Sequence, residues 1–461
     1  MNEIITHKSI NQERSQLINR ALVADLLRQE GVCSRATLAQ LSGLKQATIT
    51  NIIGEFIECG LVVETGLMSG CKGRRSIGVT LNDALYKVIG IRMTRRAFYI
   101  SIVGLSGKVY AVEEYPIGPR DDVQNTISRI RNAIQDIRRE NASTNIPAVC
   151  MAMPGPYRED RDQLLFVTEL SGWQNFPIKK ALTEGFDIPI YITNDANASA
   201  FAQLWYRSKE YGIRNMIYVL AGQGIGCGII TDGKLVLGQR GIAGEFGHNT
   251  INYRGAPCEC GNRGCLEKYC SFLVFCQNIT RRLQAGESSV LDENSLTSAN
   301  ISAAVRAGDR VAREEYEKVC EFLSIGIVNL INQFNPGMIV IGDELAEVAP
   351  DILLQIVCDK VHACINPLVY NDITIEVNRL PESPALLGGC RHCSSECFIR
   401  SHQVDETRKR RLIFASYTQR DLPFVFPLGA FYSKVCVFKS FTGKSFFVKN
   451  SYIPLWIIIF L

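Results

Sequence analysis

The sequence lacks any hydrophobic run long enough to cross a membrane. Its longest uninterrupted apolar stretch is the terminal PLWIIIFL, far short of the roughly 20 residues that a transmembrane helix needs. The first residues, MNEIITHKSINQERSQ, are polar and lack the apolar segment of a secretory signal peptide. We therefore expect a cytoplasmic protein with no membrane partner, in which the 17 cysteines are thiols or metal ligands and not disulfides.

A large excess of charge of one sign is also absent. Lys and Arg number 50 against 46 Asp and Glu, and 46% hydrophobic with 21% charged residues is typical of a soluble globular protein. A chain of 461 residues is too long for one ordinary core, so we expect two or three domains. Residues 390–461 form a distinct tail, with 11 Lys/Arg against 4 Asp/Glu and 14 of the 40 aromatic residues. The tail is interpreted either as a genuine extension or as the product of a shifted reading frame.

The N-terminal residues carry helical patterns. Apolar residues recur with helical spacing over residues 11–29, and Ser34 is a suitable N-cap for a short helix that ends before Gly43. A second helix is predicted over residues 45–59, with an apolar stripe and a polar first half. The segments LVVETG and SIGVTLN can then pair as a hairpin. Residues 1–82 therefore predict a winged helix-turn-helix whose second helix reads the major groove of DNA.

The side chains expected to contact DNA lie on these helices and at the tip of the hairpin. They are Arg35, Lys45, Gln46, Thr48, Thr50, Asn51, Lys72, Arg74 and Arg75. The last three are placed to contact phosphates. Net charge does not decide whether this segment binds DNA, because residues 1–82 contain nine Lys/Arg and seven Asp/Glu. The alternative is a three-helix protein-interaction module whose polar face is merely solvated.

From residue 87 onward the pattern changes to strands. KVIGIRM, AFYISIVG and KVYAVEEY are consistent with three consecutive strands, followed by a helix with isoleucines at helical spacing and a buried strand in PAVCMAMPGPY. PIYITNDANASAFAQLWY predicts a strand, a turn and a helix, and NMIYVLAGQGIGCGIITDGKLVLG predicts a glycine-rich hairpin. Strand triplets that alternate with helices in two halves predict an α/β domain of two similar lobes with a cleft between them.

Four motifs in this region, MPGPY, TNDAN, GEFGH and CECGNRGCLE, resemble those of the ROK family, named for repressors, open reading frames and sugar kinases. The resemblance covers about residues 11–389 and implies an actin-like (ribonuclease-H-like) fold. Kinases of the family lack the N-terminal helix-turn-helix, so the chain is similar to the xylose-type repressors. The expected domains are a winged helix-turn-helix over residues 1–82, a sugar-binding ROK domain with a zinc site over residues 83–389, and the tail over residues 390–461.

Three cysteines and one histidine form a candidate metal site. Cys258, Cys260 and Cys265 are spaced C-x-C-x4-C, and His248 precedes the first of them by ten residues. Three thiolates and one imidazole make a closed tetrahedral shell suited to structural Zn²⁺, and the pattern is similar to the zinc motif of the family. The alternative is a cluster of reduced, buried cysteines. No ligand position is left for water, so we expect the zinc to hold the structure together without taking part in chemistry.

The resemblance also implies a sugar site. The residues that it places at the hydroxyls of a sugar are Asn194, Asp195, Glu245, His248 and Glu267. His248 can serve both sites if one ring nitrogen binds zinc and the other donates to a hydroxyl. In the kinases the aspartate at the position of Asp195 is the base that takes a proton from the attacking hydroxyl. Without the motif, a surface salt bridge would be the preferred interpretation of either glutamate.

The loops that would hold ATP depart from the kinase pattern of the family. The substituted positions are Arg92, Thr94, Arg95 and Arg96 after the first strand, Gln223 in the second loop and Asp343 in the third. Side chains then occupy space that phosphates need, and the carboxylate of Asp343 would repel them.

These observations predict a sugar-responsive repressor that is not an enzyme. It would bind operator DNA as a homodimer or higher homo-oligomer and be released by an aldose, with xylose the first candidate and glucose the second. The alternative is an ATP-dependent sugar kinase fused to a DNA-binding domain, in which Arg95 and Arg96 bind phosphate.

Overall fold

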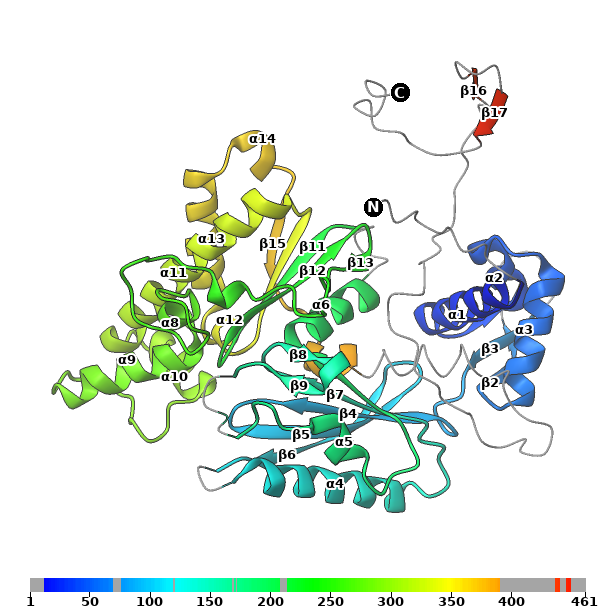
Figure 1. The fold of residues 1–461 in the computed structure, drawn as a ribbon, viewed down its shortest axis with the longest axis horizontal. Helices are drawn as coiled ribbons and strands as arrows, with labels where there is room; N and C mark the ends of the chain where they lie inside the picture. Colours follow the sequence, from blue (N-terminus) through cyan, green and yellow to red (C-terminus); the bar gives the residue numbers. More distant parts are fainter. Residues whose placement is uncertain are drawn as a thin grey trace.

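The computed structural model describes residues 12–68, 76–118, 121–167, 170, 172–207, 214–389, 436–439 and 445–448. Lys72, Arg74 and Arg75, at the predicted hairpin tip, lie outside the described residues, as does most of the tail. Figure 1 shows an N-terminal unit beside a larger, two-lobed domain. Among the described residues, no helix has both the length and the apolar character that crossing a membrane would require.

The N-terminal unit, residues 12–81, consists of three helices and a small sheet. Its elements are α1 (Gln12–Glu30), β1 (Cys33–Ser34), α2 (Arg35–Ser42), α3 (Gln46–Glu58), β2 (Val62–Met68) and β3 (Ser76–Leu81), and the strand order is β1-β3-β2. The Ser34 side chain caps α2 by accepting the Thr37 N–H, and Gly43 ends α2 in the left-handed conformation. Leu27, Leu38 and Phe56 are fully buried in the core between the helices.

The first lobe, residues 87–194, is built on a five-stranded sheet of order β10-β7-β4-β5-β6. Its strands are β4 (Lys87–Met93), β5 (Ala97–Gly104), β6 (Val109–Pro116), β7 (Val149–Met153) and β10 (Ile190–Asn194). Smaller elements are α4 (Val123–Glu140), β8 (Tyr157–Arg158), η1 (Glu159–Arg161), β9 (Gln163–Leu164) and α5 (Ile178–Thr183). The predicted isoleucine stripe of α4 packs against the sheet, because Ile130 and Ile134 are fully buried with Ile91 and Met151.

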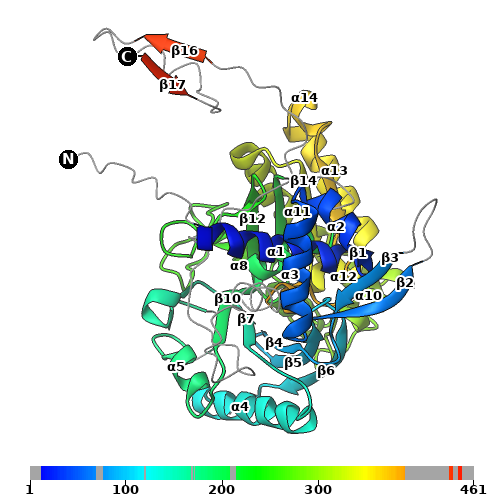
Figure 2. The ribbon, with the colours of Figure 1, turned by 90° about the vertical axis from the view of Figure 1, so that its right-hand side faces the viewer.

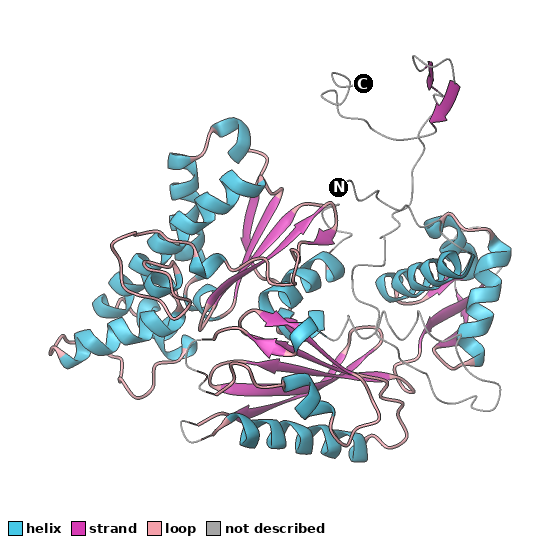
Figure 3. Ribbon diagram, in the orientation of Figure 1, coloured by secondary structure: helices cyan, strands magenta, loops and turns pink. Residues whose placement is uncertain are grey.

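The second lobe, residues 195–377, contains a sheet of order β13-β12-β11-β14-β15. Its strands are β11 (Met216–Ala221), β12 (Ile225–Thr231), β13 (Lys234–Leu235), β14 (Met338–Gly342) and β15 (Thr374–Val377). Its helices are α6 (Asp195–Tyr206), η2 (Phe246–His248), α8 (Glu267–Cys270), α9 (Phe272–Gln284), α10 (Ser298–Arg306), α11 (Arg310–Phe334), α12 (Glu344–Val348), α13 (Pro350–Cys364) and α14 (Pro367–Tyr370). Most of these helices gather on one side of the lobe (Figure 3).

The two lobes share one topology. In the first sheet β4, β5 and β6 are antiparallel neighbours, and β7 and then β10 add in parallel to β4. In the second sheet β11, β12 and β13 are antiparallel, and β14 and then β15 add in parallel to β11. Strands that are parallel neighbours end at the same edge of the sheet, so the loops after β4, β7 and β10 converge, and the loop after β14 lies next to the β11–β12 turn.

Helix α6 connects the lobes and belongs by its packing to the second. It follows β10 directly, yet Ala196 and Ala200 are buried with Met216, Tyr218 and Leu220 of the second sheet. In Figure 1 this helix lies on the side of the large domain that faces α1, and Figure 2 views the molecule from the N-terminal unit. Within the tail, the described residues form β16 (Cys436–Lys439) and β17 (Ser445–Val448), which pair antiparallel.

Candidate functional site

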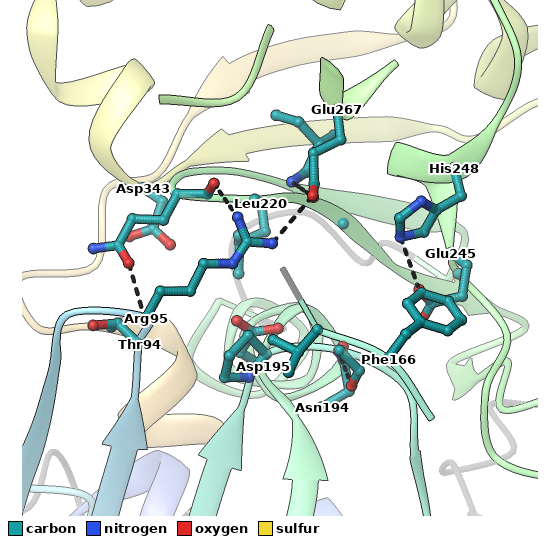
Figure 4. A pocket seen from close by; sticks show the side chains of 18 of the residues that line it. Thr94, Arg95, Phe166, Asn194, Asp195, Leu220, Glu245, His248, Glu267 and Asp343 are labelled. Atoms are coloured by element: carbon teal, nitrogen blue, oxygen red, sulfur yellow. Dashed lines mark hydrogen bonds and ion pairs between the residues drawn. The ribbon is translucent and has the colours of Figure 1, made fainter. Parts of the chain in front are cut away.

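A pocket opens between the two lobes, at the edge where the strand ends converge (Figure 4). The first lobe lines it with the end of β4 and the loop after it (Arg92, Thr94, Arg95), the loop after β7 (Pro154, Gly155), the loop after β9 (Phe166, Val167) and the end of β10 (Asn194). The second lobe adds Asp195, Gln223, Gly224, Glu245, His248, Glu267, Asp343 and Glu344. Crevices at the carboxyl ends of parallel strands are the usual ligand sites of α/β sheets. All five residues predicted to bind sugar line this one pocket.

Asn194 and Asp195 occupy the N-terminal end of α6. The Asn194 side chain caps the helix by accepting the Asn197 N–H at 3.0 Å, and its amide donates to the Gly155 carbonyl at 3.2 Å. Asp195 accepts the Ala196 N–H at 2.8 Å. Burial, followed by the nearby Asp343 carboxylate, raises the pKa of Asp195 to about 7 even though two arginines oppose the shift. This carboxyl group therefore changes charge near neutral pH.

Glu245 and His248 form the opposite wall. Glu245 precedes the short helix η2, His248 is its last residue, and Glu245 Oε2 lies 3.9 Å from Nε2 of His248. The Phe166 ring meets the His248 ring edge-on, with centroids 4.9 Å apart. Burial raises the pKa of Glu245 to about 8, with further increases from the carboxylates of Asp195 and Glu267. Phe166 was not predicted from the sequence, because a lone aromatic in a loop carries no motif.

The predicted metal ligands come together in space. The ligand atoms of His248, Cys258, Cys260 and Cys265 all lie within 4.8 Å of one another. Cys258 Sγ is 3.5 Å from His248 Nδ1, and Cys260 Sγ is 3.7 Å from Cys265 Sγ. Four ligands about 2.3 Å from a tetrahedral ion would be separated by about 3.8 Å, so these spacings fit a single bound ion. The cluster can therefore hold a metal ion.

The fold of the loop explains how such close-spaced ligands converge. Gly264, just before Cys265, has a φ of 63°, and a Cβ at this position would lie 1.7 Å from the carbonyl oxygen of Asn252. Only glycine allows this approach. The two nitrogens of the His248 ring then have different neighbours, with Nδ1 toward the cysteines and Nε2 toward Glu245. Because Glu267 follows Cys265 by two residues, the metal cluster and the pocket share one loop.

Arg95 crosses the pocket from the first lobe to the second. Its Nη2 lies 3.2 Å from Oε1 of Glu267, and its Nη1 donates to the Gln223 carbonyl. Gln223 Oε1 in turn accepts the Arg95 backbone N–H at 3.0 Å. A Cβ at Gly224 would be 2.6 Å from Arg95 Nη2, so the arginine lies directly on the glycine-rich turn that would receive phosphate in a kinase. Glu267 is held at its other oxygen by the Ile225 N–H at 2.8 Å.

Arg92 makes a second bridge between the lobes. Its Nη2 contacts both carboxylate oxygens of Asp343, with Oδ1 at 2.6 Å, and its Nη1 donates to Ser383 at 3.1 Å. The Asp343 carboxylate keeps the guanidinium protonated by raising its pKa further. The prediction that Asp343 would act as a repelling charge is therefore incomplete, because the charge is paired with Arg92. Arg92 and Asp343, which both depart from the kinase loops, therefore fill this part of the cleft as an ion pair without net charge.

The residues predicted to contact DNA lie mainly at the start of α3. Lys45, Gln46, Thr50 and Asn51 are exposed, whereas Ile49 between them is fully buried. Thr48 is partly buried. Arg35 forms an ion pair with Glu64 at 2.9 Å, which ties α2 to β2. The remaining three residues, Lys72, Arg74 and Arg75, lie outside the described part of the hairpin.

Comparison with known proteins agrees with this architecture. Residues 88–388 match the model of the ROK family. The xylose repressor of Caldicellulosiruptor bescii is 30% identical over 378 residues, which cover 80% of this chain and 94% of that protein. The transcriptional dual regulator NagC of Escherichia coli is 30% identical over 362 residues, or 77% and 86% of the two chains.

Among solved structures, a ROK family transcriptional regulator described as a homologue of the Escherichia coli Mlc protein is similar to this one. It has a TM-score of 0.69 and 25% identity, covering 84% of this chain and 97% of that one. The actin-like, two-lobed α/β domain predicted from the sequence is thereby confirmed. The resemblance first seen in the four motifs holds over most of the chain, which belongs to the ROK family.

Proposed function

We propose that this protein is a transcriptional repressor that binds operator DNA and releases it when an aldose enters the pocket between the lobes. The main support is that all five side chains proposed to bind sugar line one pocket, while Arg92 and Arg95 occupy the space that phosphates would need in a kinase. Relatives that are repressors support it, since they match along nearly their whole length. The similarity to these transcriptional regulators also supports the proposal that the protein is not an enzyme.

The chemistry of the pocket suits a neutral sugar. Carboxyl groups accept hydrogen bonds from adjacent hydroxyls, and donate one when they are protonated, and Asp195, Glu245 and Glu267 present three such groups around one space. With Asp343 and Glu344, five carboxyl groups line the pocket against two arginines, Arg92 and Arg95. A phosphorylated sugar would meet this excess of acid, so we propose a free aldose, with xylose first and glucose second. Asn194 and His248 complete the proposed set.

Kinase activity is disfavoured by what fills the phosphate loops. Arg95 lies against Gly224, and Arg92 is paired with Asp343, so neither guanidinium is available to hold ATP phosphates without breaking an ion pair. Phosphoryl transfer depends on positioning of the phosphates and their metal ion. We therefore expect no ATP-dependent phosphorylation of any aldose. A coupled turnover assay tests this expectation, and ATP consumption that depends on an aldose would contradict it.

Recognition of DNA is assigned to the N-terminal unit as a winged helix-turn-helix. The exposed, polar start of α3 carries Lys45, Gln46, Thr50 and Asn51, which suits a helix that enters the major groove. Thr48, Arg35 and the hairpin-tip residues Lys72, Arg74 and Arg75 complete the proposed contacts. A homodimer would place two such helices on a palindromic operator about one helical turn apart. The proposed boundaries remain residues 1–82 and 83–389, with the tail over residues 390–461.

The metal is proposed to be Zn²⁺ with a structural role. Three thiolates and one imidazole are the ligand set that zinc prefers in closed sites, and the four donors leave no position for a reacting water. When bound, the ion would fix the loop that carries Glu245 and Glu267 on its two sides. His248 would bind zinc through Nδ1 and direct Nε2 toward the pocket.

Two measurements test the proposal together. A thermal-shift screen with D-xylose, D-glucose and glucose 6-phosphate should raise the melting temperature only with a free sugar, because a ligand of the native state stabilises it. Gel shifts with DNA from upstream of the coding region should show specific binding that the same sugar weakens. Stabilisation by the phosphorylated sugar alone, or DNA binding without sequence preference at moderate salt, would overturn the proposal.

A further inference from the structure

The N-terminal unit is attached to the first lobe next to β4. The hydroxyl of Tyr86 donates to the Cys59 carbonyl at 2.8 Å, and Tyr86 is buried in the core of the N-terminal unit together with Leu105. Leu105 belongs to the turn between β5 and β6, where the Ser106 N–H donates to Asp83 at 2.9 Å. These contacts join the N-terminal unit to the sheet that carries Arg92 and Arg95.

A separate contact joins the same unit to the second lobe. The guanidinium of Arg28, near the end of α1, lies over the ring of Trp205 at 3.7 Å from the centroid and 5.3 Å from that of Tyr206. Trp205 is only 7% exposed. Burial lowers the pKa of Arg28 to about 10, so the arginine is held in a desolvated position against the aromatic face.

Helix α6 leads from this contact to the sugar pocket. Trp205 lies near its C-terminal end, and Asn194 and Asp195 lie at its N-terminal end. The helix has 12 residues, so its ends are about 18 Å apart at 1.5 Å per residue. Its C-terminal end is anchored to the second sheet, because Arg207 forms a buried ion pair with Glu376 of β15. The helix is therefore fixed to the second lobe along its length.

The N-terminal unit thus contacts both of the lobes between which the pocket lies. We propose that the contact between Arg28 and Trp205 couples the pocket to the DNA-binding unit, an inference that rests on the proposed sugar-responsive function. A sugar that binds residues of both lobes changes how the lobes lie relative to each other. Because the N-terminal unit is fixed to the first lobe at Tyr86 and to the second at Trp205, that change reorients the unit and alters its fit to an operator.

The test measures coupling separately from binding. Operator affinity is determined for the full chain with and without saturating D-xylose, or D-glucose if that is the sugar that stabilises the wild type. Allosteric coupling of this kind commonly changes affinity by about 5- to 150-fold. In Arg28→Gln and Trp205→Leu we expect this ratio to fall to within about threefold of one. Each variant should retain sugar binding, measured by calorimetry, and operator binding.

Two controls make the outcome specific. Arg306→Gln removes an exposed arginine of α10, distant from the contact, and should keep the wild-type ratio. Trp205→Phe keeps an aromatic face for Arg28 and should keep most of the coupling, which separates loss of the contact from general damage to α6. A wild-type ratio in both Arg28→Gln and Trp205→Leu would overturn the inference, and so would equal loss of coupling in Trp205→Phe and Trp205→Leu. A wild-type protein whose operator binding responds to no sugar would overturn the proposed function and this inference with it.

Discussion

Replacing Asp195 with asparagine should change how the stability of the protein depends on pH. In the native pocket the pKa of Asp195 is raised to about 7 by burial and by Asp343, against about 3.9 in an unfolded chain. Between these values the native state holds a proton that the unfolded chain releases, so stability falls as pH rises from about 4 to about 7. Asparagine has nearly the same shape and no such proton. The stability of Asp195→Asn relative to the wild type should therefore increase over this range and level off above it.

The size of the effect follows from the pKa difference. Three pH units at about 1.4 kcal/mol each give a ceiling of about 4 kcal/mol. By exposed surface area Asp195 is only partly buried, and contact with solvent favours its ionised form, so we expect roughly 1–2 kcal/mol. Urea unfolding of both proteins at intervals between pH 4 and pH 8 measures the difference, and titrations of groups that the two proteins share cancel in the comparison.

Asp372→Asn provides the matched control, because Asp372 is exposed on the second lobe. Its stability relative to the wild type should not depend on pH in this range. The reasoning would be refuted if Asp195→Asn showed the same flat profile as Asp372→Asn, or if its advantage were greatest at pH 4. A flat profile would mean that the native pocket leaves the pKa of Asp195 unshifted, and an advantage greatest at pH 4 would mean that the pocket lowers this pKa.

Three further predictions concern the metal, the arginine and the DNA. Metal analysis of the wild type should find about one zinc ion per chain, which Cys260→Ser should lose and Glu245→Ala should retain. Both variants should lose the sugar response and keep operator binding. Wild-type protein without zinc would contradict this prediction. Arg95→Gly should melt at a lower temperature than the wild type, because the buried carboxylate of Glu267 loses a hydrogen-bond donor. Sugar should nevertheless raise the melting temperature of this variant by more than it raises that of the wild type. An equal rise in both proteins would count against the proposed role of the contact between Arg95 and Glu267. Lys45→Ala and Thr48→Ala should each weaken specific operator binding about tenfold with little effect on nonspecific DNA, as titrations with both DNAs would report.

Local signals allowed most of the elements to be predicted from the sequence. Ser34 caps α2 and Gly43 ends it, as the residue types indicate, because capping depends only on neighbours along the chain. The strand triplet that begins at Lys87 and the isoleucine stripe of α4 also follow from short-range patterns. The metal cluster was predictable for the same reason, since three of its four ligands lie within eight residues.

The contacts between the lobes could not be predicted in this way. Arg92 and Asp343 are separated by 251 positions, and Arg95 and Glu267 by 172. The sequence marks these residues as departures from a kinase loop or as candidate sugar ligands, but no local pattern indicates which of them pair. The attachment of Arg28 to Trp205 is likewise a product of the tertiary fold.

These pairings change the interpretation of the substituted phosphate loops. If each substitution were only damage, Arg92 would leave a buried cation and Asp343 a buried anion, and either would cost several kcal/mol unpaired. Together they form an ion pair across the cleft, and Arg95 pairs with Glu267 beside it. Side chains of the protein itself thus bridge the part of the cleft that would hold a nucleotide in a kinase. The proposed sugar would enter the remaining part of the pocket, beside Asn194, Glu245 and His248, and its arrival there is what we propose alters how the lobes meet.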